Sequence, residues 1–406
     1  PTVAGLAMSF GSGSMTNSIS EITDCKLIFL IGGNPTEAHP IVGLEMKKAL
    51  SKGCTFIVAD PRRIWFAQHA KLYLPVMPGS DNWLLNAMAH VIIAEGLENK
   101  EFVKTRTEGF EELKAFLKDI TPDKASEFTG IPAEDIRQAA RLYATSEKSA
   151  IFYTLGITEH TCGTDNVRTI ANLALLTGHI GKSSTGVNPI RGQNNVQGAT
   201  DMGALPDRMH GYQYLSDQAV VEKFEKAWGV KLSRTQGVTS PTMFERMNKN
   251  QFKALYVIGE DPVMSEPNQD YTIKGLKNLE FLIVQDIFMS ETAKCADVVL
   301  PATSFAEKDG TFTNTERRVQ RVRKAINPIG NTKPDWQIIC ELSNRMGYRM
   351  DYPSPKEIWD EIARLAPIFA GINYTRIESN GIQWPCPDTK HPGTKSLHEG
   401  KFTRGL

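Results

Sequence analysis

The sequence lacks the features that mark several classes of protein. No two of the six cysteines are close enough for a Cys-x-x-Cys motif, so nothing within the chain supports a zinc or iron–sulfur site. No apolar run approaches the roughly 20 residues of a membrane-spanning helix, and no signal peptide follows Pro1. The formal net charge of +0 gives no indication of a nucleic-acid partner or an acidic membrane surface. With cysteine usage that suits a reducing compartment, these absences predict a cytoplasmic protein.

The length and composition indicate a globular protein of several domains. The chain has 406 residues, of which 41% are hydrophobic and 23% charged, both ordinary values. Because one core cannot serve so long a chain, we expect two or three domains, with boundaries predicted at 1–193, 194–330 and 331–406. Cys25, Cys54 and Cys340 lie in or beside apolar runs and are predicted to be buried thiols.

Short apolar runs alternate with helical stretches in both halves of the chain. The runs fall at 26–31, 55–59, 72–77, 150–154, 254–258, 281–284 and 297–300. Helical patterns fall at 41–51, 83–95, 165–177, 335–348 and 355–365. This alternation predicts an α/β fold with parallel sheets. The Pro- and Gly-rich segment from Ala366 onward is predicted to be a connecting arm.

The two halves repeat the same landmarks. Ile-Gly-x-Asn-Pro at 31–35 corresponds to Ile-Gly-x-Asp-Pro at 258–262. The next strand-ending acid, Asp60 or Asp286, follows 26 positions after Asn34 and 25 positions after Asp261. A proline follows each acid after a further 15 positions. This self-similarity predicts two Rossmann-like parallel-sheet domains related by an internal pseudo-repeat.

The repeat places an acid at the carboxyl end of a strand in each half, where open parallel sheets bind ligands. Asp60 and Asp286 could hydrogen-bond ribose hydroxyls or a base edge there. The alternative is that both are turn residues, a common use of Asp. Neither half has the G-x-G-x-x-G fingerprint, which disfavours ordinary NAD binding. Two related halves therefore indicate two similar nucleotide-like ligands or one pseudo-symmetric ligand.

The stretch 186–203 has neither helical nor strand periodicity and carries four glycines, a run of amides and Arg191. Glycines allow sharp turns and close approach to a ligand. Arg191 keeps its charge and can bind a carboxylate through two parallel hydrogen bonds. A long loop of this kind is usually functional, and the alternative is a polar interdomain linker.

These motifs carry a resemblance to a known family. The chain resembles the catalytic subunit of molybdopterin-dependent formate dehydrogenases, within the bis-(molybdopterin guanine dinucleotide) oxidoreductases. The resemblance is most specific at 187–198, 258–262, 284–288 and 296–301. It implies the fold of domains 1–3 of the formate dehydrogenase and DMSO reductase type. The segment after Pro1 resembles the one that follows the family's metal-binding Cys or selenocysteine and its adjacent His.

By this resemblance the chain contains no metal ligand of its own, and the ligand is expected just before Pro1. A 4Fe-4S cluster is expected only in a preceding domain, and a cofactor-binding barrel after Leu406. Arg191 and Gln193 match the substrate-site residues. The residues implied to hold the two guanine dinucleotides with Mo or W are Gly33, Asn34, Pro35, Thr36, Asp60, Pro61, Arg62, Gly79, Ser80, Asp81, Gly156, Ile157, Thr158, Gly192, Gly259, Glu260, Asp261, Gln285, Asp286, Thr292 and Asp335.

The implied reaction is the two-electron oxidation of formate to carbon dioxide, or its reverse. The implied partners are formate or carbon dioxide and an electron-transfer subunit or carrier, with no nucleic acid and no membrane span. Two alternatives stay open: another molybdopterin oxidoreductase such as nitrate reductase, and a cofactor-binding fragment without activity. The basic run 316–324 is interpreted as a solvated strand or hairpin face, and the alternative is contact with a cofactor phosphate or an electron-transfer partner.

Overall fold

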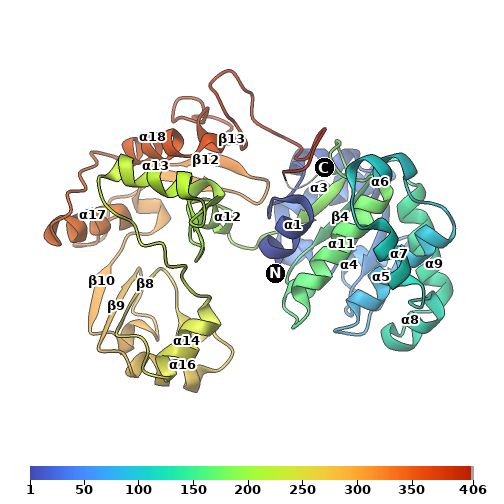
Figure 1. Ribbon diagram of the computed structural model, residues 1–406, viewed down its shortest axis with the longest axis horizontal. Helices are drawn as coiled ribbons and strands as arrows, with labels where there is room; N and C mark the ends of the chain where they lie inside the picture. The colour runs from blue at the N-terminus through green and yellow to red at the C-terminus, as the bar shows by residue number, and fades with distance from the viewer. Residues whose placement is uncertain (404–406) are drawn as a thin grey trace. The chain divides into compact units, whose positions relative to one another are not determined.

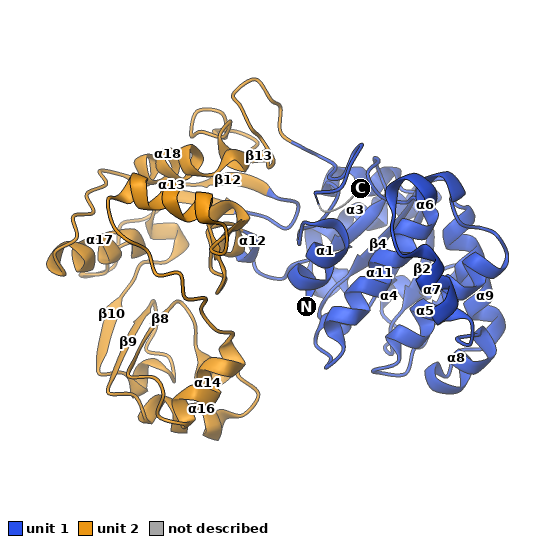
Figure 2. Cartoon of the chain, viewed as in Figure 1, with its two compact units in different colours: residues 1–197, 313–317, 394–406 blue, residues 198–312, 318–393 orange. Residues whose placement is uncertain are grey.

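The computed structural model describes residues 1–403, which form two compact units (Figure 2). Unit 1 contains residues 1–197, 313–317 and 394–403, and unit 2 contains 198–312 and 318–393. The units are discontinuous in sequence, because two later segments return to unit 1. The division at 193 and 330 stays a prediction. None of the described helices is both long and apolar enough to cross a membrane.

Unit 1 is built on a five-stranded parallel sheet of order β3-β2-β1-β4-β5. The strands are β1 Leu27–Ile31, β2 Thr55–Ala59, β3 Leu72–Leu74, β4 Ser149–Tyr153 and β5 Gly186–Pro189. Side chains of β1 alternate between two cores: Phe29 packs on one side of the sheet and Ile28 on the other. Burial on both faces explains why these strands read as continuous apolar runs.

Helices cover both faces of this sheet (Figure 1). Those of unit 1 are α1 Thr2–Phe10, α2 Pro35–Ala38, α3 Pro40–Ser51, α4 Trp65–His69, α5 Asp81–Ala94, α6 Lys100–Arg106, α7 Phe110–Leu117, α8 Pro122–Thr129, α9 Ala133–Thr145, α10 Leu155–Thr158 and α11 Gly163–Thr177. Helix α1 has no counterpart among the predicted elements. It packs on α11, where Gly5 lies so close to Val167 that an added Cβ would come within 2.7 Å of the valine side chain.

Unit 2 contains a second parallel sheet of order β10-β9-β8, with β8 Ala254–Ile258, β9 Phe281–Asp286 and β10 Val298–Pro301. This order repeats β3-β2-β1 of unit 1. Its helices α14 Ser240–Asn248, α15 Pro262–Ser265 and α16 Gln269–Lys277 follow the same alternation. The parallel α/β prediction is therefore confirmed in both halves of the chain.

The rest of unit 2 surrounds a separate core. It contains the sheet β11-β12-β13 (Gly310–Thr313, Arg318–Val322, Ile382–Gln383), the hairpin β6 Arg208–Met209 and β7 Gln213–Tyr214, and the helices α13 Gln218–Trp228, α17 Asp335–Arg345 and α18 Pro355–Leu365. The prediction of a connecting arm after Ala366 is wrong in one respect. Ala366, Phe369, Ile372 and Trp384 are buried in this core, so the segment forms part of a folded domain.

The stretch 186–203 is also more ordered than its pattern predicts. Its start is β5, which pairs with β4, and its end is helix α12 Val196–Asp201. Both elements are short, and neither is long enough to show a hydrophobic period. The three thiols predicted to be buried, Cys25, Cys54 and Cys340, are buried.

A buried arginine joins the separate segments of unit 1. Arg317 lies in the run interpreted as a solvated face, but it is 0% exposed, so that interpretation is wrong for this residue; its φ is positive, at 68°. Its guanidinium donates to the carbonyl oxygens of Met15, Thr394 and Lys395 at 2.9–3.0 Å. The neighbouring Glu316 accepts a hydrogen bond from the Ile19 backbone at 2.7 Å. One cation thus ties the N-terminal segment to residues 313–317 and 394–403.

We predict that Arg317→Leu lowers the free energy of unfolding by about 3 kcal/mol, because three buried carbonyls lose a charged donor. Denaturant unfolding of the purified chain measures this. Arg168→Leu, which removes an exposed guanidinium from α11, is the matched control and should change stability by no more than about 0.5 kcal/mol. Equal stability of the two variants would contradict the role assigned to Arg317.

Candidate functional site

The turns after β1 and β4 press against each other at the carboxyl edge of the unit 1 sheet. Gly32 has φ +58°, and its amide donates to Ala59 O at 3.0 Å. Its carbonyl accepts from the Gly156 amide at 3.1 Å and from the Thr154 hydroxyl at 2.6 Å. A Cβ on Gly156 would lie 2.7 Å from the Gly32 backbone. Both positions therefore require glycine, and the two turns form a continuous backbone surface.

A cavity of about 340 Å³ lies over these turns, at the carboxyl ends of β1 to β4. Half of its lining consists of residues predicted from the sequence to bind a cofactor. These are Gly33, Asn34, Asp60, Pro61, Arg62, Asp81 and Gly156. The other lining residues are Gly32, Ala59, Ile64, Val76, Pro78, Thr154 and His160. These residues lie together because the carboxyl ends of parallel strands meet at one edge of a sheet. The turns that follow β1, β2, β3 and β4 are therefore neighbours there.

Two buried carboxylates face this cavity. Burial raises the pKa of Asp60, while the Arg62 amide, 2.8 Å away, and the Arg62 guanidinium lower it. Burial also raises the pKa of Asp81, whose carboxylate lies 3.7 Å from His160 Nε2. The same nitrogen is 2.9 Å from Gly156 O, so it carries the proton. The cavity thus offers carboxylate acceptors and, at Arg62, an exposed cation.

The remaining predicted residues of unit 1 surround this cavity without lining it. Thr36 donates to the Asn34 side chain at 2.7 Å, and Ser80 donates to Met77 O at 2.6 Å. Gly79 has φ +86° and makes the turn before α5. Pro35 begins α2, and Ile157 and Thr158 belong to α10. These residues shape the turns, and a direct role in binding stays a prediction for them.

The equivalent turn of unit 2 repeats the backbone of unit 1. Gly259 has φ +62°, close to +58° at Gly32. Asp261 has φ −117° and ψ 78°, and Asn34 has φ −118° and ψ 81°. The Gly259 amide donates to Gln285 O at 2.8 Å, as the Gly32 amide donates to Ala59 O. Asn34 and Asp261 therefore occupy equivalent places in their own sheets.

The predicted side chains of unit 2 bond mainly to one another. Asp261 accepts hydrogen bonds from the Thr292 hydroxyl at 2.5 Å and the Thr292 amide at 3.0 Å. Although burial alone would raise the pKa of Asp261, these bonds outweigh it and the pKa is lowered. Gln285 is fully buried and donates to Asp335 at 2.8 Å.

Neighbouring groups complete this network. Gln285 also accepts from the Tyr256 hydroxyl, and Asp335 pairs with Lys308. Glu260 accepts from Ser265 at 2.5 Å. Asp286 ends β9 and accepts from the Ile287 amide at 2.6 Å. The sequence does not indicate that Tyr256 and Lys308 belong to this network, because neither residue lies in a recognisable binding motif.

Arg191 follows β5, and both its backbone amide and its guanidinium make hydrogen bonds. Its amide donates to the Thr315 hydroxyl at 3.2 Å, and that hydroxyl donates to Pro189 O at 3.0 Å. One terminal nitrogen of the guanidinium donates to Gly13 O at 3.3 Å. Its Nε is buried without a hydrogen-bond partner among the described residues. Gly192 and Gln193 are exposed. Their roles in cofactor and substrate binding stay predictions.

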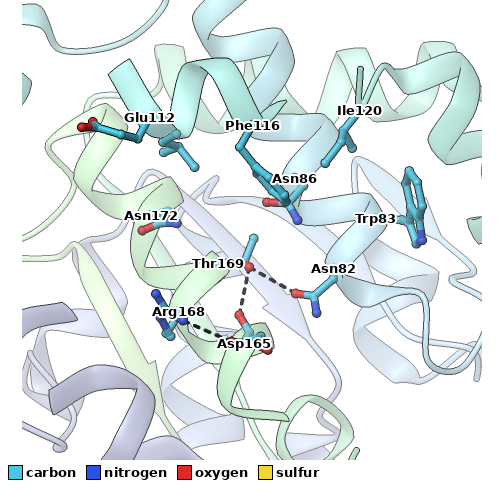
Figure 3. A pocket seen from close by; sticks show the side chains of 11 residues that line it. Asn82, Trp83, Asn86, Glu112, Phe116, Ile120, Asp165, Arg168, Thr169 and Asn172 are labelled. Carbon is cyan, nitrogen blue, oxygen red and sulfur yellow. Dashed lines mark hydrogen bonds and ion pairs between the residues drawn. The ribbon is translucent and has the colours of Figure 1, made fainter. Parts of the chain in front are cut away.

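A larger cavity of about 560 Å³ lies elsewhere in unit 1, between α5, α7 and α11 (Figure 3). The Thr169 hydroxyl lies 3.1 Å from the Asn82 side chain and 2.9 Å from the Asp165 carbonyl, and the exposed Phe116 also lines the cavity. None of the predicted binding residues lines it. Size alone therefore does not identify the site, and the strand-end cavity is the better candidate.

Comparison with known proteins identifies relatives of the whole chain. The chain is 49% identical to the F420-dependent formate dehydrogenase subunit alpha of Methanocaldococcus jannaschii, over 99% of this chain and 59% of the relative. It is 47% identical to formate dehydrogenase H of Escherichia coli, over 99% of this chain and 57% of that protein. The chain thus spans about three fifths of the length of these relatives.

A solved structure is also similar. Acetylene hydratase from Pelobacter acetylenicus has a TM-score of 0.74 and 26% sequence identity, covering 92% of this chain and 53% of that one. Residues 4–345 match the molybdopterin oxidoreductase family. Because this match covers most of the chain, the protein belongs to the molybdopterin oxidoreductases.

Proposed function

We propose that this chain is the cofactor-binding core of a formate dehydrogenase. The observation that carries the proposal is Arg191, a fixed cation after the end of β5 whose buried Nε has no hydrogen-bond partner within residues 1–403. Formate is too small to offer apolar binding area, so its charge must supply most of its recognition. A guanidinium fork suits a carboxylate. The relatives named formate dehydrogenase, at 47–49% identity, support the same substrate.

Family membership supports a molybdopterin cofactor, and we propose the bis-guanine dinucleotide form with Mo or W. The residues of unit 1 fit one nucleotide. Backbone turns at Gly32 and Gly156 permit close approach, Asp60 and Asp81 can accept from base N–H groups or ribose hydroxyls, and Arg62 can face a phosphate. The repeated turn at 259–261, with Gln285, Asp286, Thr292 and Asp335, would hold the second.

The reaction removes two electrons and one proton from formate to give carbon dioxide. The metal and pterin, when bound, would take up the electrons. This chain's own residues would bind and orient formate: Arg191 through its charge, and Gln193 through its amide. The metal ligand would come from residues before Pro1, and an electron-transfer partner is expected because the relatives are alpha subunits. A cytoplasmic location stays a prediction.

We predict that Arg191→Ala in the complete enzyme lowers kcat/KM for formate by one to two factors of ten. A charge-assisted hydrogen bond contributes about 1.5–3 kcal/mol, and its loss removes that stabilisation. Arg191→Lys keeps the charge but not the fork, so its activity should lie between the two. Steady-state kinetics on enzyme with measured metal content tests this. Wild-type kinetics in fully metal-loaded Arg191→Ala enzyme would contradict the substrate role and favour the alternative that 186–203 is an interdomain linker.

We also predict that Asp60→Ala and Asp286→Ala reduce cofactor content, because each removes an acceptor at a strand end. Metal analysis and pterin fluorescence of the complete enzyme measure the content. Asp119→Ala, at an exposed position after α7, is the matched control and should bind cofactor normally. Full molybdenum or tungsten content in both variants would leave the two acids as turn residues.

A further inference from the structure

The parallel sheet of unit 2 ends at the strand where the sheet of unit 1 continues. In unit 1, β1 lies between β2 and β4, so both of its edges are paired. In unit 2, β8 pairs with β9 and with no other strand within residues 1–403. Because β1 and β8 each lead into an Ile-Gly turn of the internal repeat, they are counterparts. One edge of β8 is therefore open where β1 meets β4.

The backbone groups at this open edge can be assigned. The Gly259 amide donates to a carbonyl of β9 at 2.8 Å. Since alternate residues of a strand direct their N–H and C=O groups to opposite sides, the amides of Tyr256 and Ile258 point away from β9. The same side of β1 faces β4, where the Leu27 amide donates to Lys148 O at 3.0 Å. The open edge of β8 thus has donors and acceptors in position for another parallel strand.

The side chains of this sheet do not suit a solvent-exposed edge. Strand β8 reads Ala-Leu-Tyr-Val-Ile and contains neither a charge nor a proline, the residues that normally prevent an edge strand from pairing. Ile258 is 44% exposed, whereas its counterpart Ile31 is 0% exposed. Phe281 and Val298 are exposed on the same face of the sheet. Parallel sheets are normally covered on both faces, so this apolar surface indicates a permanent contact.

The turn that follows β8 has space for a second turn beside it. A Cβ on Gly32 would lie 2.8 Å from the Gly156 backbone, because the turn after β4 packs there. No atom of the described residues lies within 4 Å of a Cβ built on Gly259. The two turns nevertheless share one conformation, with φ +58° at Gly32 and +62° at Gly259. Unit 2 therefore has the first turn of the pair, in the conformation that accepts the second.

We propose that a parallel β-strand from the part of the protein outside residues 1–406 pairs with β8 in the complete enzyme. This strand takes the place beside β8 that β4 has beside β1, and it ends in a glycine turn that packs on Gly259. The occupant belongs to the same polypeptide, because an apolar, uncharged edge in the middle of a sheet suits a permanent part of the fold. A relative of sufficient length is known: the match covers only 59% of the Methanocaldococcus jannaschii protein. The proposal does not depend on the substrate.

Hydrogen exchange of the complete enzyme, resolved to single amides by mass spectrometry, tests the pairing. The amides of Tyr256 and Ile258 should exchange at least about a thousandfold more slowly than unstructured amides, as in a stable core strand. Those of Phe29 and Ile31 on β1 are the matched control and should be equally slow. Fast exchange at Tyr256 and Ile258, with slow exchange on β1, would show an open edge and overturn the proposal.

Photo-crosslinking of the complete enzyme identifies the occupant. p-Benzoylphenylalanine at Ile258 or Phe281 should cross-link to a peptide of the same polypeptide from outside residues 1–406. That peptide should contain a short apolar run followed by glycine. The same probe at Ile329, which is exposed and lies outside this sheet, is the control and should not yield the peptide.

An isotope-labelled mixture of enzymes distinguishes a cross-link within one polypeptide from a cross-link between two copies. A cross-link only to another subunit, to a second copy or to residues 1–406 would overturn the assigned occupant. The absence of any cross-link from both Ile258 and Phe281 would overturn it as well. Neither measurement uses formate turnover, so a failure here leaves the proposed function to be decided by its own tests.

Discussion

The burial of Arg317 is the constraint on which unit 1 depends. A guanidinium removed from water is costly unless its donors are satisfied, and here three backbone carbonyls from two distant segments accept from it. Arg317 reaches all three acceptors only when residues 313–317 and 394–403 have returned to the first sheet. The same return brings Thr315 to Arg191 and Asn195 to the Thr313 amide, at 2.9 Å. The architecture of unit 1 and the shape of its Arg191 segment therefore depend on one set of contacts.

The internal repeat has kept its backbone while its side chains have diverged. Gly32 and Gly259, and Asn34 and Asp261, agree within a few degrees, because the turn must pass under the end of the neighbouring strand. The polar groups around these turns differ. Those of unit 1 face an open cavity, whereas Asp261, Gln285 and Asp335 are hydrogen-bonded to their neighbours. A ligand at the second turn would meet a preorganised network, and a ligand at the first would complete one.

The sequence predicted the parts of the site that follow from local rules. Asp60, Asp81 and Gly156 converge because strand ends in a parallel sheet meet at one edge, and that edge can be recognised from apolar runs and turn residues. It did not predict α1, the order of 186–203 or the buried core after Ala366. It also gave no indication of Thr315, Tyr256 or Lys308. All of these elements and contacts depend on packing against a segment remote in sequence. Hydrophobic periodicity and turn residues report only on local structure, so they do not predict such packing.

The discontinuity of unit 1 has a consequence during synthesis. Strands β1 to β5 leave the ribosome before the acceptors of Arg317 at 394 and 395, which come some 200 residues later. At typical elongation rates of about 5–20 residues per second, the first sheet waits roughly ten seconds or more for them. Thr315 is 126 residues after Pro189 and is made earlier within that interval, so the Arg191 segment lacks its Thr315 contact only until then. The nascent chain can thus form the turns at Gly32 and Gly156 before the contacts of Arg191 and Arg317 are complete.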